Sequence, residues 1–204
     1  NYNVVVGDEA GTAITTGDGN VAVGYSAGDA LDVGSYNIAV GMNALTADTK
    51  GSTSIAIGYG TLTAQNFTSA TDAHNIAIGH GTGGAVTTGT FNTLIGGLAG
   101  DGATTASYST ALGYGSLGGA MTGEGNVALG VNTLLVATSA HSNTAVGTSA
   151  MSSATTGTNN VAVGRNALDA NTTASNNTAV GYDALGANTT GSENTALGTD
   201  ALKA

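Results

Sequence analysis

The chain has 204 residues, of which 34 are glycine, none is proline or cysteine, and only 8% are charged. Its net charge of −10 leaves no basic face of the kind that binds nucleic acid or docks on an anionic membrane. The lack of cysteine excludes disulfides and thiolate metal sites, and no apolar run approaches the about 18 residues that indicate a transmembrane helix.

One phrase recurs along the whole chain, and a glycine closes it each time. These glycines are Gly7, Gly24, Gly41, Gly58, Gly79, Gly96, Gly113, Gly130, Gly147, Gly164, Gly181 and Gly198. Every step is 17 residues except the step from Gly58 to Gly79, which is 21 and places a four-residue insertion within 59–74. A short period kept this strictly indicates a solenoid. We therefore expect a single repeat domain over 1–204, with twelve units.

Each unit predicts a short strand of about five residues that ends at its glycine. A branched aliphatic residue always precedes the glycine, and valine, isoleucine or threonine stands three residues before it. Between them lies alanine in ten of the twelve units, with Val5 and Leu94 as the exceptions. This alternation has the period of two that is typical of strands.

The second half of each unit predicts the return of the chain to the next strand. "AL" after the glycine predicts a second short strand or a bend, and "TTG" predicts a turn in which glycine tolerates positive φ. Seventeen residues are too few for a strand–helix–strand crossover. The predicted fold is an all-β parallel β-solenoid, or β-roll, of twelve coils. Coils about 4.8 Å apart would make it about 55–60 Å long.

A narrow coil offers few large side chains to bury, so we expect partner chains to cover the remaining strand face. The alanine column lies on the opposite face from the branched column, and its small residues would let another backbone approach closely. We therefore expect a closed symmetric homo-oligomer that associates through the alanine and glycine column. The alternative is a single-chain solenoid in which one strand face simply carries small side chains. A column of asparagine four residues before each glycine, in ten of twelve units, predicts either a ladder of stacked amides or a turn-shaping role.

The phrases "NVAVGYSAG", "NIAVGMNAL", "SIAIGYGTL" and "NVAVGRNAL" resemble the head repeats of YadA-like trimeric autotransporter adhesins, and similar arrays occur in bacteriophage tail fibres. The resemblance covers essentially the whole chain. It implies a left-handed β-roll and a homotrimer of three parallel rolls. Such repeats serve as heads, spacers and shafts, so the resemblance is specific for architecture and unspecific for function.

Three histidines are the first candidates for chemistry. His74 and His80 are six residues apart around the insertion, with Asp72 nearby, and His141 stands alone. The functional interpretation of His74 and His80 is a metal site or an acid–base pair, but no third ligand with suitable spacing is visible. We therefore interpret them as polar residues on loops, and predict neither a metal site nor a cofactor.

The remaining motifs also point to structure. Asp29, Asp101 and Asp169 share a column but not adjacent coils, which does not make a calcium ladder. "GYSAG" has the letters of a nucleophile elbow around Ser26, but the repeat explains its position. "GTGG" lacks the lysine and the strand–helix context of a phosphate loop. We predict no catalytic residue.

Two features are candidates for recognition. An aromatic column directly after the glycine holds Tyr25, Tyr59, Tyr114 and Tyr182, which would either bind sugars or proteins or fill the groove between chains. The insertion near Phe67 is the one break in the register, and insertions often mark the binding face of a solenoid.

The sequence favours a structural and adhesive module of an extracellular trimeric fibre, on a bacterial surface or a phage. Its partner would be a host receptor or a polysaccharide. A threonine-rich ice- or surface-binding solenoid is the alternative, and a polysaccharide-degrading tailspike is less favoured because the carboxylates scatter. The chain begins in phase and ends within a coil, so we expect a section of a longer fibrous chain.

Overall fold

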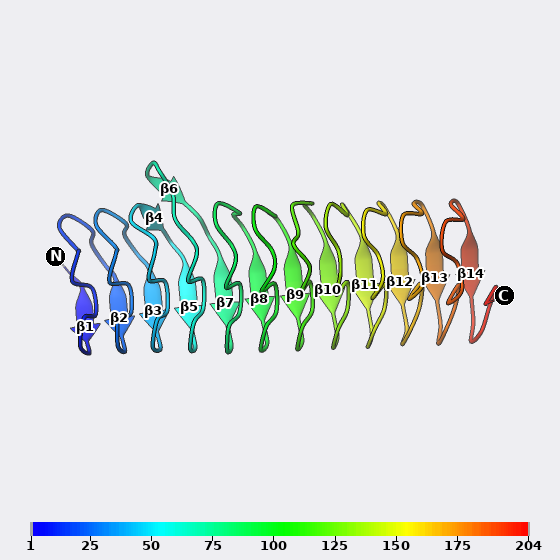
Figure 1. Ribbon diagram of the computed structural model, residues 1–204, viewed down its shortest axis with the longest axis horizontal. Helices are drawn as coiled ribbons and strands as arrows, with labels where there is room; N and C mark the ends of the chain where they lie inside the picture. Colours follow the sequence, from blue (N-terminus) through cyan, green and yellow to red (C-terminus); the bar gives the residue numbers. More distant parts are fainter. Residues whose placement is uncertain (1, 204) are drawn as a thin grey trace.

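The computed structural model describes residues 2–203 and shows a parallel β-solenoid, with the chain winding once around the long axis for each repeat (Figure 1). Its strands are β1 (Val4–Val6), β2 (Val21–Val23), β3 (Ile38–Val40), β4 (Gly51–Ser52), β5 (Ile55–Ile57), β6 (Thr71–Asp72), β7 (Ile76–Ile78), β8 (Thr93–Ile95), β9 (Thr110–Leu112), β10 (Val127–Leu129), β11 (Thr144–Val146), β12 (Val161–Val163), β13 (Thr178–Val180) and β14 (Thr195–Leu197). Within residues 2–203 there is no helix, and hence none that could span a membrane.

Twelve of these strands form one sheet in chain order, with β4 and β6 set apart, so about eleven turns separate the first strand from the last. Each strand pairs in parallel with its equivalent in the next turn, as in Val4↔Val21, Val5↔Ala22 and Val6↔Val23. The predicted solenoid and its 17-residue offset are confirmed. The twelve strands of this sheet span three residues each rather than about five.

The glycine that closes each unit is required by the close stacking of turns. At Gly113, φ is +133°, and a Cβ atom there would lie 2.5 Å from the carbonyl oxygen of Gly130 in the next turn. The "AL" segment that follows is a turn and not a second strand. In this turn the residue four after the glycine has a left-handed backbone conformation, as at Leu45 (φ +54°) and Leu134 (φ +51°).

One turn is longer than the others. The register between β5 and β7 is Ile55↔Ile76, an offset of 21 residues. The extra chain rises out of the solenoid beside β6, which pairs with β4 of the preceding turn (Figure 1). Phe67 is 5% exposed and holds the base of this loop, while Thr68, Ser69 and Ala70 at its tip are exposed.

The alanine column faces the interior of the solenoid, so the prediction that it forms a seam between chains is wrong. The central residue of each strand from β2 to β14 in the long sheet is at most 3% exposed, and all but Leu94 are alanine. The branched residues on either side of it point outwards. Alanine lies inside because the coil is narrow, and a small residue on the strand leaves room for a large one from the opposite wall.

That large residue comes from a different position in different turns. In most turns it is the residue four after the glycine. These fully or almost fully buried side chains are Leu45, Leu62, Leu117, Leu134, Met151, Leu168 and Leu185. Their positive φ, from 48° to 57°, costs an L-residue about 1–2 kcal/mol. Full burial of the side chain contributes about 1.5–3 kcal/mol and offsets this strain.

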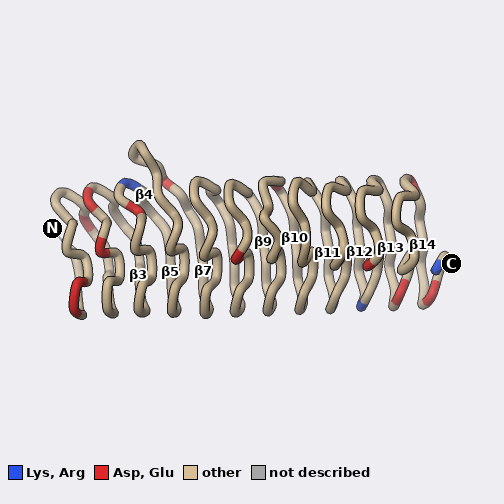
Figure 2. The backbone as a smooth tube through the Cα atoms, in the orientation of Figure 1, with Lys and Arg blue, Asp and Glu red and all other residues tan. Residues whose placement is uncertain are grey.

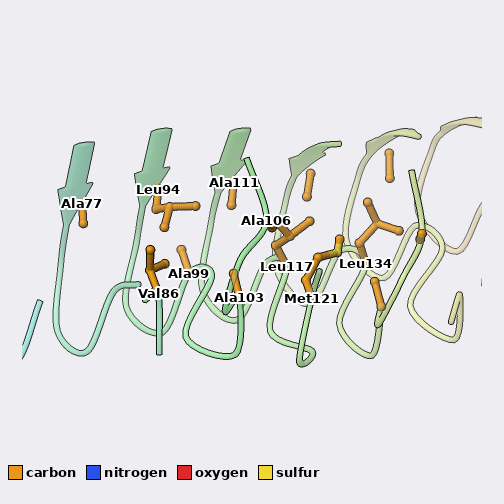
Figure 3. Close-up of a cluster of buried hydrophobic side chains, with 14 of the residues drawn as sticks. Ala77, Val86, Leu94, Ala99, Ala103, Ala106, Ala111, Leu117, Met121 and Leu134 are labelled. Carbon is orange, nitrogen blue, oxygen red and sulfur yellow. The ribbon is translucent and has the colours of Figure 1, made fainter. Parts of the chain in front are cut away.

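Four turns carry glycine at that position, and another side chain then fills the space. Val86 packs beside Gly83, and Leu94 replaces the strand alanine between Gly83 and Gly100. A Cβ atom at Gly100 would lie 2.9 Å from Cδ1 of Leu94. Figure 3 shows Val86, Leu94, Leu117 and Leu134 projecting into the same interior from different parts of their turns. The exception at Leu94 is therefore a compensation for the glycines on both sides.

The asparagine column forms a buried ladder that combines both predicted roles. The side chain of Asn160 donates to the carbonyl of Ala174 (2.9 Å) and to Oδ1 of Asn143 (3.0 Å). Its own Oδ1 accepts the backbone N–H of Asn177 (2.9 Å) in the next turn. The amide ladder and the turn-shaping bond thus come from one side chain, which explains why the column is asparagine.

Candidate functional site

The histidines do not form a cluster. His74 and His80 precede and follow β7 and stack on different neighbours: His74 lies 4.9 Å from the Phe91 ring centroid, and His80 lies 5.2 Å from that of Tyr59. No group of three or more histidine, aspartate or glutamate side chains among residues 2–203 has the geometry to hold a metal ion.

His141 has a structural role within a second hydrogen-bond ladder. Its Nδ1 atom accepts the backbone N–H of Glu124 at 3.0 Å. In other turns a serine hydroxyl takes this place, as when Ser52 accepts the N–H of Ser35 (3.0 Å) and Ser192 accepts that of Ser175 (3.1 Å). The imidazole therefore replaces a serine as an acceptor between turns.

Ser26 and the aspartate column also lie apart from any catalytic arrangement. Ser26 is 7% exposed, and its hydroxyl donates to Glu9 (3.0 Å), with no histidine bonded to it. Burial raises the pKa of Asp29, Asp101 and Asp169 above the usual range. Each of these carboxylates is four turns from the next along the axis, and the column between Asp29 and Asp169 is otherwise uncharged.

The inserted loop is fixed from below by a buried polar network. The carboxylate of Asp48, fully buried, accepts the backbone N–H of Gly51 (2.8 Å) and the side-chain amide of Gln65 (2.6 Å). Gln65 in turn accepts from Asn75 (2.8 Å), and the ammonium of Lys50 donates to the carbonyl of Thr68 (3.2 Å). The loop is thus a supported projection, with its tip free to contact a partner.

The paired threonines divide between two roles. In most pairs the first threonine donates its hydroxyl to a backbone carbonyl of the next turn, as Thr87 does to Thr104 (3.1 Å) and Thr155 does to Thr172 (3.0 Å). The second, such as Thr156 and Thr173, is exposed. The exposed second threonines of the pairs therefore form one column, which is a narrow surface for recognising ice.

Two open hollows lie in the last turns of the described chain. Leu185, Asn188, Gly191 and Leu202 line one of them. The other is bordered by Asp169, Asp183 and Lys203. There the ammonium of Lys203 donates to the carboxylate of Asp183 (2.8 Å), and this contact raises the pKa of Lys203. Neither joins a nucleophile to a base.

The feature that sequence reasoning missed is the outer face of the long sheet. Its two columns lie three residues and one residue before each glycine, and we call them the aliphatic strip. Of these 24 side chains, 19 are valine, isoleucine or leucine, five are threonine and none is charged. All are half-buried or exposed. Figure 2 shows few charged residues along the solenoid, most of them toward its two ends.

Two exposed columns border the aliphatic strip. The entry-edge column lies five residues before each glycine, and includes Tyr36, Phe91 and Tyr108, which are 66%, 46% and 61% exposed. The exit-edge column lies one residue after the glycine and contains the four predicted tyrosines. Tyr25, Tyr59, Tyr114 and Tyr182 are 48%, 50%, 57% and 43% exposed. The aromatic residues thus flank the strip on both sides.

The aromatic rings stack along the axis, and this limits what they offer to a ligand. Phe91 and Tyr108 lie parallel with centroids 5.1 Å apart, and Tyr59 and His80 stack similarly. Arg165 lies over the ring of Tyr182, 5.9 Å from its centroid. Sugars pack against open ring faces, whereas these stacks mostly present ring edges.

Searches of protein-family models, curated proteins and solved structures found no match to this chain. The geometry and chemistry of the chain itself therefore carry the functional argument.

Proposed function

We propose that this chain is a structural module of an extracellular fibre, built from three parallel copies that meet through the aliphatic strip. The observation that carries the proposal is the strip itself: 24 outward side chains without a charge, in a chain of 13 acidic and three basic residues. An exposed apolar patch of this extent is typical of an interaction surface.

The size of the face supports a stable assembly. Between the two edge columns the sheet is about 20 Å wide, and about eleven turn spacings of about 4.8 Å make it about 53 Å long. This gives about 1,000 Å² per chain, compared with about 800 Å² per partner in a standard interface. A trimer divides this area between two neighbours, about 500 Å² per chain or about 1,000 Å² in total at each contact, which is the lower limit for a specific interface. It also closes around the axis, which leaves no strip exposed.

The trimeric state and left-handed winding follow from the resemblance to YadA-like head repeats and to phage tail fibres. The adhesive role and a surface receptor or polysaccharide as the partner follow from the same resemblance. The supported loop at Thr68, Ser69 and Ala70 projects from the solenoid and is where we expect such a partner to bind. The single column of exposed threonines supports ice binding less well.

Light scattering of the chain in solution tests the assembly. We expect three times the 19.4 kDa chain mass. Val146→Lys, which places a charge in the strip, should yield the monomer mass, whereas Thr156→Lys, on the exposed threonine column, should leave the trimer intact. A folded monomer of the parent chain, or a trimer that tolerates Val146→Lys, would contradict the proposal. Thermal hysteresis would instead favour ice binding.

A further inference from the structure

We infer that the entry-edge column of one chain packs against the exit-edge column of the next, so that the two columns form the seams of the assembly. This inference rests on the proposed self-association through the aliphatic strip. It identifies which residues meet at each seam and what keeps the chains in register.

The geometry of a single chain shows why these columns need a second chain. Within one turn the two edges are six residues apart along an extended segment, which is about 20 Å. They therefore cannot contact each other in the same chain. Rotation about an axis parallel to the solenoid places one chain's entry edge beside its neighbour's exit edge at the same height.

The sizes of the paired residues are complementary at that height. Phe91 would meet Gly97, and Gly19 would meet Tyr25. Threonine and asparagine stand opposite the next tyrosines: Thr53 would meet Tyr59, and Asn176 would meet Tyr182. A large side chain on one edge thus has a smaller one opposite it in these turns. The two glycines also receive rings within the chain, since a Cβ atom would lie 2.8 Å from Tyr36 at Gly19 and 3.5 Å from Tyr114 at Gly97.

Three turns carry a large side chain at both edges: Tyr36 with Met42, His74 with His80, and Tyr108 with Tyr114. The stacking along the axis makes room at the last of them. The ring of Tyr114 leans over the preceding turn, where it lies 3.5 Å from the Cβ position of Gly97. The ring stack of His74, Phe91 and Tyr108 presents its edges sideways, which suits close packing against a neighbouring chain.

A cysteine pair tests the contact directly, because the chain has no cysteine of its own. Ser142 and Thr148 are small residues at opposite edges of one turn. A disulfide requires Cα atoms about 4.4–6.8 Å apart, which these two positions can reach only between chains. Under mild oxidation, Ser142→Cys/Thr148→Cys should give a covalent trimer on a non-reducing gel.

The controls separate this inference from the proposed function. Each single variant, and Ser142→Cys/Thr156→Cys, should stay largely monomeric on the gel. A trimer by light scattering without the cross-link would overturn the edge pairing and leave the trimer standing. A monomer by light scattering would overturn both.

A swap of side-chain size tests the complementarity. Gly97 lies outside the positive-φ region, so a tyrosine there is compatible with the backbone. Gly97→Tyr should overfill the seam against the partner's Phe91 and raise the dissociation midpoint concentration about tenfold or more. Phe91→Gly/Gly97→Tyr should restore it, since it reproduces the pair of Gly19 and Tyr25. Val131→Tyr, which would face Gly125, is the matched control and should have no effect. An unaffected Gly97→Tyr, or a swap that fails to restore assembly, would overturn the inference.

Discussion

Leu94 provides the sharpest test of how the solenoid core is built. It is 1% exposed and occupies a strand position that is alanine in the neighbouring turns. Leu94→Ala should cost about 4 kcal/mol, in the upper part of the usual range for such a change. The high value is expected because Gly83 and Gly100, on either side, have no side chains that could relax into the cavity.

The same reasoning predicts a specific rescue. Gly100→Leu on its own should destabilise the protein by about 1–3 kcal/mol, since its Cβ would lie 2.9 Å from Leu94. In the Leu94→Ala background it should recover about 2 kcal/mol, because the turn would then have the core of Ala128, Leu134 and Ala137. The remaining cost is the left-handed backbone at position 100, about 1–2 kcal/mol for leucine.

Urea unfolding of the parent and the three variants, followed by circular dichroism at one protein concentration, measures these differences. Hydrogen exchange of the β8 amides then reports whether the effect is local to that turn. A double variant no more stable than Leu94→Ala would refute the reasoning. It would mean that the position of the large side chain within the turn cannot be exchanged, and that Leu94 has another role.

Three further predictions concern the ladders and the aspartate column. Asn160→Ala should lower the free energy of unfolding in urea by about 3 kcal/mol, because buried partners in two turns lose their hydrogen bonds. Asn160→Ser should lower it less, since serine occupies this column in two other turns. His141→Val should be less stable than His141→Ser by about 1 kcal/mol, because only serine keeps an acceptor for the Glu124 amide; equal stability would contradict the ladder. Burial raises the pKa of Asp101, so the folded state disfavours its charged form, and the stability it contributes when protonated is lost as pH rises through the usual value of about 4 and beyond. Asp101→Asn should therefore melt at a higher temperature than the parent at pH 7 and at the same temperature at pH 2, and a gap that persists at pH 2 would contradict this cause.

The strict period made most of the fold predictable from the sequence. It identified the strands, their parallel stacking and the glycines at which neighbouring turns come closest. Gly113 is an example, since a side chain there would collide with the backbone of Gly130. The period also revealed the longer turn, because four residues had to be accommodated between Gly58 and Gly79.

The direction of the strand faces could not be predicted from the same pattern. Alternation shows that a strand has two faces and leaves open which one is inside. The usual preference for large aliphatic residues in the core suggested the wrong face. In a narrow coil the interior instead takes alanine from the strand and one leucine from the opposite wall, as Ala128 and Leu134 do in one turn. Placing Leu134 there requires a left-handed backbone, which no propensity for leucine indicates.

Because alanine takes the inner face of the strands, most of the large aliphatic side chains lie on the outer face of the sheet. The interior of a turn buries about one large side chain, whereas the aliphatic strip carries 19 valine, isoleucine and leucine residues that a lone chain leaves partly exposed. β-Branched residues stabilise a strand in part through packing against the surface that covers it. In the proposed assembly, this uncharged and mostly aliphatic outer sheet would form a second core between copies, and the edge columns would determine how those copies are aligned.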